Sequence, residues 1–193
     1  DAVGGTNDLG NVVVVSALNV TTDANGFNAD TLLQSAGTGT TTFNGPVVIN
    51  DAGAGAGTGL AITTGMIAVN ATVSTLNDGP ATFTPATLLD IASGADMSLA
   101  GAFLQDGAGS VESAGDVVTT ADAITFTGDV TLTDGESVVV TSAGGNITFI
   151  STVDATTDYT EDLQLTAGGG SIDFLDAVGG TNDLGNVVVV SAL

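Results

Sequence analysis

The reactive groups of this chain are carboxylates, and they are densest in the segment DATTDYTED at positions 154–162. Hard cations such as Ca²⁺ bind about six to eight oxygen atoms from carboxylates, carbonyls and waters. The candidate calcium ligands here are Asp154, Asp158, Glu161 and Asp162. The segment departs from the EF-hand pattern, because Tyr159 stands where that loop needs glycine and Leu165 where it needs the closing glutamate. The sequence therefore predicts either a calcium site at these residues or a solvated acidic face.

Basic residues are absent from the whole chain. It has 193 residues with 22 Asp and Glu but no Lys, Arg, His or Cys, which gives a formal net charge of −22. This composition excludes an imidazole base, a Schiff-base lysine, a cysteine nucleophile, a disulfide and a thiolate metal site. Nucleic acids and anionic membrane surfaces are expected to be repelled, because binding to phosphates depends on cationic side chains.

The composition also indicates how these carboxylates are positioned. Hydrophobic residues make up 43% of the chain, which is too many for an acidic disordered segment. Abundant Val, Ile and Thr with 28 Gly predict many short strands joined by tight turns. The apolar run at Val12–Val15 is far shorter than the ~18 residues that a membrane-spanning helix needs, so no membrane insertion is expected.

The chain contains an exact internal repeat. Residues 1–18 and 176–193 both read DAVGGTNDLGNVVVVSAL, which is an offset of 175 residues. We interpret this as a tandem array, and residues 1–193 as one continuous segment of it. Both copies carry a run of four valines without charge or proline, which is a strand edge open to pairing. The expected partner is therefore the protein itself, as tandem repeats in one long chain or as copies docked end to end.

A finer repeat lies inside the 175-residue unit. A strand-like segment with Phe and, four residues later, Val occurs in four places: Phe43/Val47, Phe126/Val130, Phe149/Val153 and Phe174/Val178. A second alternating strand follows each of them. The recurrence of this two-strand motif along the chain predicts an all-β parallel β-helix (β-solenoid) with about eight coils of roughly 22 residues. Phe126, Phe149 and Phe174 should then stack inside, and the Gly-Ala segment 53–59 should form a loop. The alternative is a series of tandem β-sandwich domains.

One catalytic arrangement remains open to a chain with these residues. Some β-helical enzymes cut polysaccharides with two carboxylates about 5–9.5 Å apart. Asp129 and Asp154 occupy similar places after Phe126 and Phe149, and adjacent coils would bring them near each other. The chain has no Trp and a single Tyr, so it offers few platforms for sugar stacking. We therefore expect that it is not an enzyme.

Several segments resemble the repeats of very large filamentous-haemagglutinin-like proteins of bacterial surfaces. They are QSAGTGTTTFNGPV (34–47), LAGAFLQDGAGSVESAGDVVTTADAITFTGDVTL (99–132), GGNITFISTVDATT (144–157) and DLQLTAGGGSIDFLDAVGG (162–180). The resemblance implies a right-handed β-helical rod, exported, in an extracellular or cell-surface location. It also implies a role in adhesion or as a fibre.

These observations favour a non-enzymatic structural repeat unit of an extracellular filament or surface fibre. The alternative is an adhesin stalk or binding module that contacts glycans or a partner cell. Apart from a calcium ion at the acidic segment, no cofactor is expected.

Overall fold

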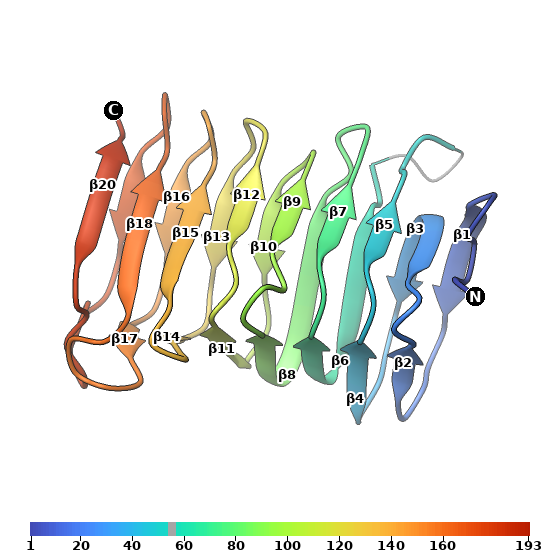
Figure 1. Ribbon diagram of the computed structural model, residues 1–193, viewed down its shortest axis with the longest axis horizontal. Coiled ribbons are helices and arrows are strands. Elements are labelled where there is room, and N and C mark those ends of the chain that lie inside the picture. Colours follow the sequence, from blue (N-terminus) through green and yellow to red (C-terminus); the bar gives the residue numbers. More distant parts are fainter. Residues whose placement is uncertain (54–56) are drawn as a thin grey trace.

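A computed structural model describes residues 1–53 and 57–193 of the chain. This part is all-β and contains no helix, and its 20 strands stack as a parallel β-solenoid of about eight turns with 22-residue spacing. The turns follow one another from the N-terminal to the C-terminal end of the stack (Figure 1). Every strand pairing recorded within the described residues is parallel, which excludes the β-sandwich alternative. The same residues include no helix long and apolar enough to cross a membrane.

Each turn of the solenoid passes over three faces, which we call faces A, B and C, in the repeating order B, C, A. Face A begins with Val3, which forms an isolated bridge to Phe27 in the first half of β3, and it ends with β20. Its strands are β3 (Phe27–Gln34), β5 (Val47–Ile49), β7 (Val73–Thr75), β9 (Met97–Leu99), β12 (Val117–Thr119), β15 (Ser137–Thr141), β18 (Asp162–Thr166) and β20 (Val187–Ser191).

Face B carries most of the phenylalanines. It begins at β1 and takes the second half of β3 and the first halves of β6 and β8. Its strands are β1 (Leu9–Val14), β6 (Leu60–Val69), β8 (Ala81–Ile91), β10 (Phe103–Gln105), β13 (Ile124–Phe126), β16 (Ile147–Phe149) and β19 (Ile172–Phe174).

Face C carries a column of acidic residues. It includes the second halves of β6 and β8, and its last member, Val178, forms an isolated bridge to Val153. Its other strands are β2 (Val20–Thr22), β4 (Thr40–Phe43), β11 (Ser110–Ser113), β14 (Val130–Leu132) and β17 (Val153–Ala155). Of the predicted loop at 53–59, Gly53 and Gly57–Gly59 lie outside strands, and residues 54–56 lie outside the described part.

The predicted phenylalanine ladder is confirmed on face B. Phe126 pairs in register with Phe149, and Phe149 pairs with Phe174. In both pairs the ring centroids are 5.1 Å apart, and the rings are nearly parallel, at 3° and 9°. Phe103 extends the ladder, with its ring 5.0 Å from that of Phe126. Burying such a ring stabilises the fold by about 1.5–3 kcal/mol, so this column is a major part of the core.

The valines of three copies of the motif were also expected to point inward, and Val130 and Val153 are buried, whereas Val178 at the end of the stack is 38% exposed. Val130, Val153 and Val178 follow one another on face C. Phe43, by contrast, lies on face C and Val47 on face A, so the grouping of this pair with the other three is wrong by one face. The spacing within the motif is the same, because the corner after each of these four phenylalanines takes three residues. Between Phe43 and β10 the chain crosses fewer faces than a whole number of turns would need. The phenylalanines of the later motifs therefore lie on a different face from Phe43.

The corners between faces are built from asparagine and glycine. Asn70 Nδ2 donates to Asn44 Oδ1 in the preceding turn at 3.0 Å, and Asn44 Nδ2 donates to the Thr22 carbonyl before that at 3.2 Å. At another corner the backbone of successive turns passes so closely that a Cβ on Gly170 would collide with the Gly145 carbonyl oxygen. Side chains that bond along the axis and residues without a Cβ thus keep the turns in contact at their corners.

The two identical 18-residue segments lie on different faces. In the N-terminal copy, Val12 pairs with Leu32 on face B. In the C-terminal copy, the equivalent residue Val187 pairs with Leu163 on face A. The same sequence therefore forms a strand at two positions that differ by one face of the solenoid, although the strand bounds differ, at Leu9–Val14 in one copy and Val187–Ser191 in the other.

Candidate functional site

A column of polar side chains runs along the outside of face C. Asp90 of β8 pairs with Glu112 of β11, Glu112 pairs with Thr131 of β14, and Thr131 pairs with Asp154 of β17. Each of these residues follows a buried aliphatic residue, so each points away from the core. The parallel register thus places three carboxylates on four successive turns of one face.

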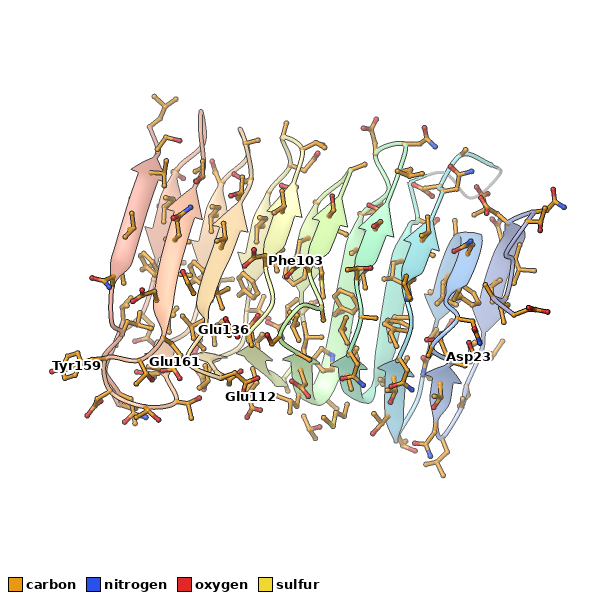
Figure 2. All side chains as sticks on the ribbon, in the orientation of Figure 1. Asp23, Phe103, Glu112, Glu136, Tyr159 and Glu161 are labelled. Carbon is orange, nitrogen blue, oxygen red and sulfur yellow. The ribbon has the colours of Figure 1, made fainter. Side chains whose placement is uncertain are left out.

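Two shallow hollows lie along this column, and both are lined by Glu112, whose side chain is labelled in Figure 2. The first, of about 420 Å³, is lined by Asp90, Ala92, Glu112, Thr133, Asp134 and Thr156. The second, of about 440 Å³, is lined by Glu112, Asp129, Thr131, Thr152, Asp154, Ala155, Thr156, Thr181 and Asn182. Oxygen atoms dominate both linings, which makes these hollows suited to cations or to hydroxyl-rich ligands.

Two carboxylates that line the first hollow, those of Asp90 and Asp134, repel each other. Partial burial raises the pKa of Asp90, and the nearby charge of Asp134 raises it further. Burial likewise raises the pKa of Asp116 at the corner before β12, although a hydrogen bond from the Val139 amide, 2.8 Å from Asp116 Oδ1, opposes this. Because the sequence contains no basic side chain, only solvent ions can compensate these charges.

Asp129 and Asp154 line the same hollow but are not equivalent. Val130 pairs with Val153, so Asp129 stands opposite Thr152, whereas Asp154 stands opposite Thr131. The two aspartates, which were expected in similar places on adjacent turns, are therefore offset by two residues in register while lining one hollow. Asp129 Oδ1 accepts hydrogen bonds from the Ser151 hydroxyl and from Thr152, and the Ser151 bond is the main reason that the pKa of Asp129 is lowered.

Three of the four predicted calcium ligands bind the following turn. Asp154 Oδ1 accepts from the Thr181 amide at 2.8 Å, and Asp158 Oδ1 accepts from the Asp183 amide at 2.9 Å. Asp162 Oδ1 accepts from the side-chain amide of Asn186 at 2.9 Å. Each carboxylate therefore has a structural partner in the segment 181–186.

Glu161, the fourth predicted ligand, is buried, with 2% of its surface exposed. Burial alone would raise its pKa, but hydrogen bonds outweigh that effect and lower the pKa. Its carboxylate accepts from the Thr160 hydroxyl at 2.6 Å and from the amides of Thr157 and Gly135, each at 3.3 Å. Glu161 thus ties its own turn to the corner of the preceding turn.

Within the described residues, no group of three or more Asp, Glu, His or Cys side chains is placed to hold a metal ion. The calcium site at Asp154, Asp158, Glu161 and Asp162 stays a prediction.

Sequence analysis missed the acidic column because the motif spacing varies. Val130 and Val153 follow their phenylalanines by four residues, but Val111 follows Phe103 by eight. Phe103 is aligned with Ile124 and not with Phe126, which accounts for two of the extra residues, and the corner before Val111 is two residues longer. An alignment on the aliphatic residues of the strands rather than on phenylalanine would have placed Glu112 in the same column as Asp154.

Comparison with models of protein families, with curated proteins and with solved structures found no match for this chain.

Proposed function

We propose that this chain is a structural repeat unit of an extracellular filament or surface fibre, without enzymatic activity. The observation that carries the proposal is the continuous stack of parallel strands across about eight turns, joined to an exact repeat of its own first 18 residues. In such solenoids each turn contacts only its neighbours, so the same structure extends to any length by repetition.

The composition of the chain supports a structural role. It has no His, Lys, Arg or Cys, which removes most groups that act as bases, nucleophiles or oxyanion-stabilising cations. Its 22 carboxylates lie mostly in corners and on outward positions, and several bond to the next turn. Like charges at this density keep neighbouring rods apart and soluble.

Electron microscopy of the native material tests this proposal directly. A structural solenoid gives an unbranched rod of constant width, with about 38 Å of length for each eight turns at ~4.8 Å per turn. Denaturing mass measurement on the same material separates one long chain from short subunits. A string of separate globular beads, or a compact particle, would contradict the proposal.

The hollows of face C favour an adhesin stalk as the second candidate. Their linings of carboxylates and threonines suit sugar hydroxyls or a cationic cell-surface group. Binding of the chain to partner cells or to arrayed glycans, compared with a Glu112→Gln variant, tests this candidate. Glu112 makes no recorded side-chain hydrogen bond in the described part, so the variant should fold normally. Equal binding by both chains, or by neither, would argue against it.

A further inference from the structure

The two copies of the 18-residue segment use opposite edges of the same strand. The N-terminal copy bonds to the turn that follows it. The Val3 amide donates to the Gly26 carbonyl at 3.2 Å, and the Val3 carbonyl accepts from the Asn28 amide at 2.9 Å. Farther along, the Val14 carbonyl accepts from the Ser35 amide at 2.9 Å.

The C-terminal copy bonds to the turn that precedes it. The Ala177 carbonyl accepts from the Val153 amide at 3.0 Å, and the Gly179 amide donates to the Val153 carbonyl at 2.8 Å. The Asn186 carbonyl accepts from the Leu163 amide at 2.8 Å.

The backbone groups used by the two copies do not overlap. Residues 177, 179 and 186 correspond to residues 2, 4 and 11, whereas the N-terminal copy uses residues 3 and 14. In a parallel ladder, neighbouring residues direct their backbone groups to opposite sides. One strand could therefore make both sets of hydrogen bonds at once.

The valine side chains of the two copies also face the same way relative to the core. In the N-terminal copy, Val12 and Val14 stand opposite the buried residues Leu32 and Gln34. In the C-terminal copy, the equivalent residues Val187 and Val189 stand opposite the buried residues Leu163 and Leu165. A shift of one residue in either pairing would have turned these valines outward. The two copies therefore agree in which valines face the core, as one shared strand requires. The glycine after the first valine also has the same conformation in both copies, with φ of 73° at Gly4 and 65° at Gly179.

We infer that the 18-residue segment is a junction strand shared by consecutive repeats, and that each repeat is rotated by one face of the solenoid relative to the one before. In the shared strand, one edge pairs as β20 pairs with β18 on face A, and the other edge pairs as β1 pairs with β3 on face B. Face B of one repeat therefore continues face A of the preceding repeat. The inference rests on the proposed function, because it requires successive repeats in one fibre.

Counting faces gives the geometry of the fibre. From Val12 on face B to Val187 on face A, the described chain makes 23 steps from one face to the next. With three faces in each turn, one repeat completes seven turns and two further faces. At ~4.8 Å per turn, the rise per repeat is about 37 Å. Three repeats, or 23 whole turns, return to the starting face.

The rotated junction creates a contact that neither copy contains by itself. β19 is the last strand of face B, and Asp173 is its outward residue, aligned with Thr148. In the rotated junction, β2 of the next repeat covers β19, which places its outward residue Thr21 beside Asp173. In an unrotated junction, the valine strand would instead lie over β19, as it lies on face B at the N-terminal end, and Val13 would stand beside Asp173.

Engineered disulfides distinguish the two junctions, because the chain has no cysteine of its own. A polypeptide of two consecutive repeats is made with Asp173→Cys in the first repeat and Thr21→Cys in the second. The matched variant keeps Asp173→Cys and carries Val13→Cys in the second repeat instead. A control pair, Thr125→Cys with Thr148→Cys, joins residues already aligned in adjacent turns. All are oxidised with glutathione disulfide and mapped by mass spectrometry after peptic digestion.

We expect disulfide formation with Thr21 to match that of the control pair, and none with Val13, because adjacent parallel strands bring Cα atoms within the range a disulfide spans. A disulfide with Val13 but not with Thr21 would overturn the rotation, and so would the absence of both while the control pair forms. Electron microscopy of the same two-repeat polypeptide separates the two proposals. A straight rod without the Thr21 disulfide refutes the junction alone, whereas two separate beads refute the fibre.

Discussion

Replacing Phe149 with alanine is expected to destabilise the solenoid strongly. Phe149 is 1% exposed, and its ring lies between those of Phe126 and Phe174, 5.1 Å from each. Removal of such a ring costs about 3–5 kcal/mol, through lost burial and the cavity that remains. The upper part of this range is expected here, because two stacked partners lose a neighbour and each such pair contributes about 0.5–1.5 kcal/mol beyond burial.

Urea unfolding monitored by circular dichroism measures this loss in the Phe149→Ala variant. Thr148→Ala on the same strand is the matched control, because Thr148 points outward and its removal should change stability by less than about 1 kcal/mol. Phe174→Ala should fall between them, since Phe174 is only half-buried and stacks on one ring. A loss below about 1 kcal/mol for Phe149→Ala would refute its place in the core and the register of face B.

Four further outcomes are expected, each measured as a urea midpoint. Gln105→Leu should lower stability by about 2 kcal/mol, because its buried side chain bonds the amides of Thr127 and Gly128; an unchanged midpoint would contradict this. Asp90→Asn should raise the midpoint at pH 7, because the raised pKa of Asp90 marks an unfavourable charge; the gain should vanish as pH falls through that pKa, and a pH-independent gain would argue against this cause. Glu161→Gln should lower the midpoint at pH 7, because the pKa of Glu161 is lowered and its charge therefore stabilises the fold. The difference in midpoint between the variant and the unchanged chain should disappear only as pH falls through that lowered pKa, and equal midpoints at pH 7 would contradict this prediction. Millimolar Ca²⁺ should raise the midpoint above that in EDTA at low salt, and identical curves would remove the calcium proposal.

The sequence predicted the fold where its spacing was regular. The steps from Phe126 to Phe149 and from Phe149 to Phe174 are nearly equal in length. Equivalent residues therefore fall at equivalent positions in successive turns, and the phenylalanine ladder could be predicted directly. Phe43 was placed on the wrong face because the motif records the distance across one corner and not the number of corners passed since the previous motif. The face on which a strand lies depends on how many corners precede it. Corners of different length have similar composition, so this number is hard to count from the sequence.

The candidate site was less predictable than the core. Local density drew attention to residues 154–162, but three of the four carboxylates there bond to the segment 181–186, one turn later. The column of Asp90, Glu112 and Asp154 is dispersed over 65 residues of sequence and joins only through the parallel register. Burial of Glu161 was also unexpected, since its three hydrogen-bond donors come from two different turns.

The close spacing of the turns gives the rod the electrostatics of a strong polyelectrolyte. With 22 carboxylates on about eight turns stacked at ~4.8 Å, the axis carries roughly one negative charge for every 1.7 Å. Double-stranded DNA carries about one per 1.7 Å, and it retains a condensed layer of counterions at that density. A long fibre of these repeats should hold a similar layer, and any oligocation that binds it gains entropy by releasing those ions. Its association with cationic peptides or polyamines should therefore weaken linearly in log K with the logarithm of salt concentration, as protein binding to nucleic acid does.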